Sequence, residues 1–197
     1  MKTIKKLAAI AFILFGVVAF TNAQNFVVNK DQSTVKWNGK KVGGEHYGTI
    51  KFNSGTLHVS NGQVNTGVFE IDMTSIVCED ITNEATNNRL VNHLKSDDFF
   101  SVESHPISRM TITGVKKTSG IEYEFNGNLT IKGITNPITF KATTDVSGST
   151  LRASGLMVVD RAKYDIKFRS ASFFQNLGDN LIYDDFTIDF TLVANAQ

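Results

Sequence analysis

The sequence predicts an all-β protein, an eight-stranded antiparallel barrel with a short helical segment near residues 84–100. Apolar and polar residues alternate with a period of two over most of the chain, which is typical of strands with one buried face. Short turns rich in glycine and asparagine separate these strands, and such turns join antiparallel neighbours. Eight strands of this kind close into an up-and-down barrel, which removes exposed edges and either fills with side chains or holds one small ligand.

A cleaved secretion signal is expected over residues 1–23. Three lysines near the start precede an apolar run over residues 7–20, which is too short to span a membrane comfortably, and residues 21–23 resemble a cleavage site. An uncleaved N-terminal anchor is the alternative. We therefore expect residues 24–197 to form one periplasmic domain, because the 174 residues left after removing 23 from 197 suit a single barrel.

The composition disfavours some partners and some kinds of stabilisation. Without the three signal lysines, 17 of the 20 basic residues remain against 19 acidic ones, a net charge of −2, and no basic stripe indicates nucleic acid. Cys78 is the only cysteine, so the core rather than an internal disulfide must stabilise the domain. We interpret Cys78 as a small buried hydrophobe, with an intermolecular disulfide as the alternative.

Alternating apolar residues locate the strands that precede the helical segment. The dipeptide Asn61-Gly62 is a strong hairpin signal between two of them. Residues 24–30 are interpreted as a leading segment without a strand assignment. The expected strands cover residues 33–38, 48–59 and 66–73.

Residues 87–106 contain the one clear helical interruption. Arg89 with His93, and Leu90 with Leu94, form i, i+4 pairs, which places the four side chains along one side of a short helix. The rest of the chain supplies strands that could surround an apolar space beside this helix.

The end of that stretch carries a second helix signal. Ser96 is expected to be an N-cap, because Asp97 and Asp98 follow it where a helix N-terminus favours negative charge. Phe99 and Phe100 come next, and two adjacent aromatic side chains after a polar turn need an apolar environment.

Strands resume after the helical stretch and continue to the C-terminus. Gly127 lies inside the longest of them, where a glycine often marks a bulge or bend. The expected strands cover residues 109–115, 121–131, 138–144, 150–159, 164–168 and 186–192, and with the three earlier ranges they supply about the eight strands of the predicted barrel.

The sequence gives little sign of catalysis. No two of His46, His58, His93 and His105 have the spacing of a local metal motif. There is no G-x-S-x-G segment, no phosphate-binding loop and no activating context for Cys78. We therefore expect a binding protein rather than an enzyme, with no metal and no cofactor.

Phenylalanine is abundant on the predicted strands. Twelve of the 15 phenylalanines lie beyond the signal, and for any one of them plain core packing is the better interpretation. The alternative is a dry channel lined by the same faces. Burial of apolar surface contributes about 25 cal/mol per Å², so such a channel would bind a long hydrocarbon chain strongly.

Five segments, in order, resemble the YceI-like family of exported, lipocalin-like barrels that bind polyisoprenoids. The segment around His93 is the most distinctive, and Asp165 stands where the last segment has a glycine in the family. The five segments are residues 31–48, 69–76, 93–106, 129–137 and 160–165.

The resemblance implies an extended eight-stranded antiparallel lipocalin-like barrel with a helix over one end. It also implies a long tunnel for a prenyl chain, such as that of a polyisoprenoid or an isoprenoid quinone, held for transport or storage. Fatty acids and fatty amides are alternative ligands. Contact with a membrane during transfer, and a monomer or a homodimer, remain open.

Three polar residues are candidates for a tunnel mouth that meets the lipid head group: His46, Arg89 and His93. His46 lies in a glycine-rich segment, where the backbone can approach a ligand closely. The alternative is that His46 and His93 are hydrogen-bonded structural residues. Asp160 and Arg161 are expected to form a structural salt bridge or turn.

The apolar faces of the strands and of the helix predict the tunnel wall, and a register slip of one residue would exchange it for the opposite face. Ile188 is in phase with the last two residues of this set. The predicted wall residues are Trp37, Phe52, Phe69, Ile71, Leu90, Leu94, Phe99, Met110, Phe125, Leu129, Phe140, Met157, Phe168, Phe186 and Phe190.

Two other classes of function stay open beside a lipid carrier. The first is an enzyme acting on a lipid or small ester, with His46 or His93 as its base. The second is a solid structural barrel that works in a complex, through Cys78.

Overall fold

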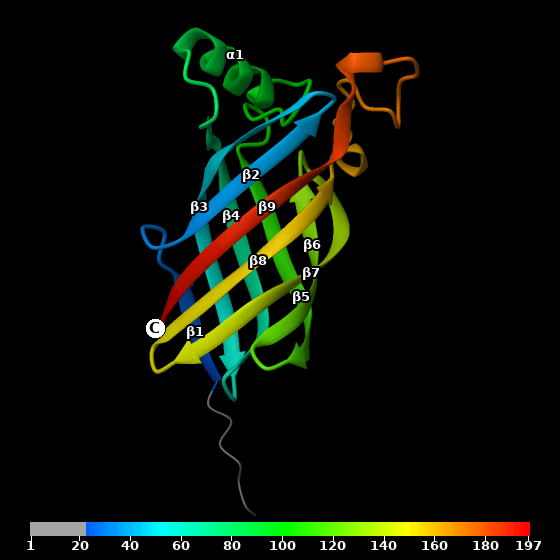
Figure 1. Cartoon of the computed structure of the whole chain (residues 1–197). Coiled ribbons are helices and arrows are strands. Elements are labelled where there is room, and N and C mark those ends of the chain that lie inside the picture. The colour runs from blue at the N-terminus through cyan, green and yellow to red at the C-terminus, as the bar shows by residue number, and fades with distance from the viewer. Residues whose placement is uncertain (1–22) are drawn as a thin grey trace, which may run out of the picture.

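The computed structural model describes residues 23–197, and its strands close into one antiparallel barrel with a helix at one end (Figure 1). The expected secretion signal lies outside the described residues except for Ala23. In the described range, no helix is long and apolar enough to cross a membrane. The predicted all-β barrel with one short helix is confirmed.

The elements follow one another in chain order along residues 23–197. They are β1 (Ala23–Val28), β2 (Thr34–Lys41), β3 (Gly44–Ser60), β4 (Gln63–Cys78), α1 (Glu84–Lys95), β5 (Ile107–Ser119), β6 (Glu122–Ile131), β7 (Ile134–Ser147), β8 (Thr150–Asp160), two short 3-10 turns (Arg161–Tyr164 and Gly178–Asn180) and β9 (Ile182–Ala196).

The barrel has eight strand positions, and β1 and β2 together occupy one of them, since both pair with β3 on one side and with β9 on the other. Around the barrel the order is β2, β9, β8, β7, β6, β5, β4 and β3, and β3 pairs with β2 to close it. Strand β2 pairs with the first half of β3, and β1 pairs with the last residues of both β3 and β9. The interpretation of residues 24–30 as a leading segment was therefore wrong, because residues 23–28 continue the same edge after a short interruption.

Helix α1 begins at Glu84, where the helical segment was expected to begin, but it ends at Lys95 rather than near residue 100. Asn83 is its N-cap, and the Asn83 side chain accepts a hydrogen bond from the Thr86 N–H at 3.0 Å. Ser96 lies at the opposite end, where its hydroxyl donates to the His93 carbonyl at 2.8 Å. The predicted N-cap role of Ser96 was therefore wrong, and residues 97–100 form turns instead of helix.

The predicted strand at residues 164–168 was also wrong. Asp160 accepts a hydrogen bond from the Ala162 N–H, which caps a 3-10 turn over Arg161–Tyr164. Asp165 then adopts a left-handed conformation with φ of 59°. A glycine adopts this conformation at no steric cost, whereas aspartate tolerates it, so the turn persists with Asp165.

The end of the barrel away from α1 is filled with side chains. Phe26 and Leu151 have no exposed surface there, and Leu57, Val59 and Val64 pack with them. Because β1 and the β3–β4 turn lie at this end (Figure 1), the filled core closes the barrel opposite the helix. In the half of the barrel nearer α1, the side chains leave a cavity between them.

Candidate functional site

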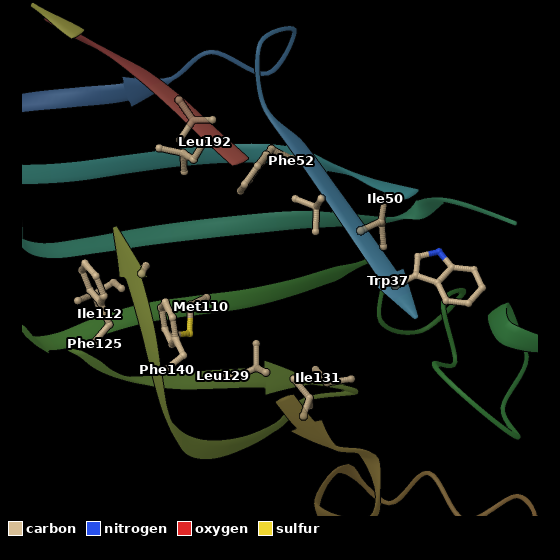
Figure 2. Close-up of a cluster of buried hydrophobic side chains, with 14 of the residues drawn as sticks. Trp37, Ile50, Phe52, Met110, Ile112, Phe125, Leu129, Ile131, Phe140 and Leu192 are labelled. Carbon is tan, nitrogen blue, oxygen red and sulfur yellow. The ribbon is translucent and has the colours of Figure 1, made fainter. Parts of the chain in front are cut away.

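An apolar cavity of about 200 Å³ occupies the half of the barrel nearer α1. Figure 2 shows Phe52, Met110 and Phe140, which lie on three different strands, among the side chains of the barrel interior. Apolar side chains form nearly all of the cavity wall. Tyr183 lines the cavity and is half exposed, so the cavity reaches the surface at the α1 end.

Strand alternation located most of the wall. Met157 shows why: it faces the cavity, while its neighbours Leu156 and Val158 are exposed on the outer face of β8. Ile188 also lines the cavity. The predicted residues that line it are Trp37, Phe52, Phe69, Ile71, Leu94, Phe99, Met110, Leu129, Phe140, Met157, Phe186 and Phe190.

Two predicted wall residues lie below or beside the cavity. Phe125 stacks on Phe140, with ring centroids 5.4 Å apart and an interplanar angle of 13°, but it does not line the cavity and lies farther from the α1 end than Leu129 on the same strand (Figure 1). Leu90 packs against the core from α1 without reaching the cavity, whereas Leu94, one turn later, does reach it.

Phe168 and His93 form an aromatic cover outside the wall. The His93 ring meets Phe99 and Phe168 edge-on, with centroids 4.9 Å and 4.6 Å away. Because Phe99 lines the cavity, this cluster lies directly behind one part of the wall. His93 also contacts the Asp98 carboxylate, with Nε2 3.0 Å from Oδ2.

The three predicted mouth residues are not brought together around the cavity. Arg89 is exposed on α1 and reaches only Thr86 within its own helix. His46 and His93 are each bound to a carboxylate, Asp80 and Asp98 respectively. Their geometry matches the alternative interpretation as hydrogen-bonded structural residues.

Other wall residues have a weaker or different sequence signal. Phe100 lines the cavity beside Phe99, and Tyr183 comes from the start of β9, which no periodicity marks. Ile166 is in phase with Phe168 in the segment expected as a strand, so alternation could have identified it. Six more are in phase with predicted residues on the same strands, and the same alternation could have identified them: Val35, Ile50, Met73, Ile131, Val159 and Leu192.

Arg161 is a buried cation in the cavity wall, with only 4% of its surface exposed. Its guanidinium donates to the carbonyls of Tyr183, Ile166 and Ile182 at 3.2, 3.0 and 3.0 Å. Its charge is paired with Asp184, with Nη2 3.3 Å from Oδ1; the Oδ1 atom accepts no well-aligned hydrogen bond. Of the two expected arrangements, Asp160 and Arg161 form the turn rather than a salt bridge with each other, and the ion-pair partner of Arg161 is Asp184.

The pKa of Asp184 reflects this environment. Burial on its own would raise the pKa of Asp184, but hydrogen bonds from Ser170 and Ser172 and the charge of Arg161 outweigh burial and hold it below its ordinary value. Asp184 is thus ionised at neutral pH, opposite the guanidinium that anchors the start of β9 to the 3-10 turn.

Gly48 allows strands β2, β3 and β4 to approach closely at the cavity rim. It pairs with Trp37 on one side and with Cys78 on the other. The Trp37 side chain on β2 reaches past Gly48 to β4, where its indole N–H donates to the Val77 carbonyl at 3.0 Å. A Cβ at residue 48 would lie 1.9 Å from that same carbonyl oxygen.

Replacement of Gly48 by alanine is therefore expected to lower the free energy of unfolding by about 3 kcal/mol, because backbone atoms must move to admit the methyl group. Urea denaturation measures the change. Gly114→Ala is the matched control, since a Cβ there meets only Asn126 Cβ at an ordinary 3.9 Å. Equal stability of the two variants would contradict the close approach at Gly48.

The sequence model of a family described as "YceI-like domain" matches residues 26–194. Protein YceI of Salmonella arizonae is 34% identical over 96 residues, which cover 49% of this chain and 47% of that relative. The chain therefore spans about half the length of the curated relatives it matches.

Solved structures share the barrel. BcnA of Burkholderia cenocepacia matches with a TM-score of 0.69 and 19% identity, over 85% of this chain and 99% of that chain. A polyisoprenoid binding domain from Saccharophagus degradans matches with a TM-score of 0.63 and 13% identity, over 87% and 98% of the respective chains. At these identities the likeness shows the fold alone.

Proposed function

This chain belongs to the YceI-like domain family, and from that premise we propose that it is an exported, periplasmic protein that holds a long-chain apolar lipid in its barrel for transport or storage. Residues 1–23 would be its cleaved signal and residues 24–197 its single domain. The observation that carries the proposal is the cavity of about 200 Å³ with a nearly continuous apolar wall.

The wall chemistry favours a hydrocarbon chain as the ligand. Each buried methylene contributes about 0.8 kcal/mol, so a chain gains affinity with every unit that enters. Polyisoprenoids and isoprenoid quinones carry such chains, and the Saccharophagus degradans domain with the same fold is a polyisoprenoid binding domain. Fatty acids and fatty amides fit the same wall and are the alternative ligands.

The residues around the cavity favour binding over turnover. The enzyme alternative requires His46 or His93 as a base, and neither is among the residues that line the cavity. Both imidazoles are bound to carboxylates outside it. We therefore assign no catalytic role to either residue.

Transient contact with a membrane would suit a carrier whose cavity reaches the surface near α1. The segment before β9 exposes Phe173 and Phe174, with 43% and 49% of their surfaces accessible. Lys167 lies over the Phe173 ring at 5.4 Å, and Arg169 is nearby in the chain. Aromatic and basic side chains together favour the interface of an anionic bilayer.

Native mass spectrometry of the protein purified from the periplasm, followed by solvent extraction, tests the proposed function. We expect one prenyl lipid or quinone per protein. A fatty acid or amide would keep the cavity as the site and change the ligand class. A protein that stays empty after incubation with prenyl lipids would contradict the proposal. The same spectrum distinguishes a monomer from a homodimer.

A further inference from the structure

Three side chains with metal-binding atoms meet at the rim of the barrel, outside the cavity wall. His46 comes from β3, Cys78 from the end of β4, and Asp80 from the turn that leads toward α1. Their ligand atoms all lie within 4.8 Å of one another. His46 Nδ1 is 2.8 Å from Asp80 Oδ2, and Cys78 Sγ is 3.1 Å from Asp80 Oδ1.

The backbone around this cluster holds the three donors in place. The Tyr47 N–H donates to Asp80 Oδ1 at 3.0 Å, and the Glu79 N–H donates to the Tyr47 carbonyl at 2.9 Å. On the helix side, the Asn87 amide donates to the Cys78 carbonyl at 2.9 Å. These contacts fix the Asp80 carboxylate and the backbone at Tyr47 and Cys78, and the imidazole and the thiol are each oriented by their contact with Asp80.

We propose that His46, Cys78 and Asp80 form a binding site for a divalent transition metal ion, with Zn²⁺ as the first choice. A thiolate, an imidazole nitrogen and a carboxylate oxygen are the protein ligands that Zn²⁺ takes, and the thiolate favours it over Mg²⁺ and Ca²⁺. Binding forms a bond from the ion to Cys78 Sγ, and the thiol proton passes to water.

The proposed site keeps one coordination position open. Three protein ligands leave the fourth tetrahedral position of Zn²⁺ to water or to an external ligand. Cys78 is buried, whereas about a third of the His46 side chain is exposed, so solvent reaches the cluster from the His46 side. Metal binding is compatible with the burial of Cys78, whereas an intermolecular disulfide is not, because the buried thiol is not accessible to another chain.

The test uses the full purified protein, reduced and freed of metal with a chelator that is then removed. Titration with Co²⁺ is expected to produce the near-ultraviolet thiolate charge-transfer band and the visible bands of a tetrahedral site. Calorimetry with Zn²⁺ alone is expected to show one site per chain. Absence of the charge-transfer band in the parent protein would overturn the proposal and leave the cluster as a hydrogen-bonded anchor for the turn.

Variants locate the ion. His46→Gln is expected to weaken Zn²⁺ binding by more than about tenfold, since even changes outside the ligand shell cost that much. Cys78→Ser should abolish the cobalt charge-transfer band. His58→Gln is the matched control: this histidine contacts Asn25 Oδ1 at the far end of the barrel, and its variant should bind like the parent. Full binding by His46→Gln, which changes a partly exposed side chain, would also overturn the proposal.

Discussion

Replacement of Met157 by tryptophan is expected to lower the affinity of the protein for its lipid by about 30-fold while the barrel stays folded. Met157 lines the cavity and is only partly buried, so a larger side chain enters space that a ligand would occupy. If the indole displaces two or three methylene groups of the ligand, about 2 kcal/mol of binding free energy is lost at about 0.8 kcal/mol each. That loss corresponds to the expected change in affinity.

Val158→Trp is the matched control for this substitution. Val158 follows Met157 on β8 but points outward, with 55% of its surface exposed. The control should keep the lipid content of the parent, and both variants should unfold at nearly the parent's urea concentration. Quantification of bound lipid per protein, after incubation at a lipid concentration below the dissociation constant of the parent, decides the result. Parent-like lipid content in folded Met157→Trp protein would show that the cavity is not the binding site.

Replacement of Arg161 by methionine is expected to lower the free energy of unfolding by about 3 to 5 kcal/mol. Methionine keeps much of the apolar stem, but the carbonyls of Ile166, Ile182 and Tyr183 lose their donor, and Asp184 loses its countercharge. Urea denaturation at neutral pH measures the effect. Arg152→Met, at an exposed position on β8, should change stability by less than about 0.5 kcal/mol.

The pH dependence separates the ion pair from the carbonyl contacts. In the parent, the pKa of Asp184 is held below its ordinary value of 3.8, so this group contributes stability above that pH and loses it as the pH falls through the folded value. Without Arg161 the pKa of Asp184 rises. The stability difference between parent and Arg161→Met should therefore narrow as the pH falls through the acidic range. A difference that is constant with pH would show that only the carbonyl contacts matter.

The sequence alone predicts the barrel and much of its wall because both depend on local alternation. Trp37, Phe140 and Phe190 were identified by strand parity, and the fold then brought these distant strands together. Alternation shows which face of a strand a residue is on, but it does not show how far along the barrel axis the residue lies. Phe125 shares its face with Leu129, yet it lies in the layer beneath the cavity while Leu129 lines it.

Helix starts, turns and contacts between distant residues were harder to predict, because local sequence patterns do not determine them. Asn83 and Ser96 are both good capping residues, but only Asn83 begins a helix, and the acidic pair after Ser96 indicated a second start that the structure does not contain. Residues 164–168 alternate like a strand, but a left-handed Asp165 ends that pattern. His46 and Asp80 are 34 residues apart, so only the strand pairing reveals their contact.

Because the far end of the barrel is filled with side chains, the cavity is closed at that end and is not a tunnel through the barrel. Phe26 and Leu151 close the far end, and Phe125 lies beneath the cavity, so on the proposed function a ligand would enter and leave at the α1 end. An amphiphile would then insert tail first, with its head group at the opening. The depth of the cavity, from Phe125 to the opening, would then limit the length of tail that the barrel can bury. A longer tail would leave its remaining units outside the barrel.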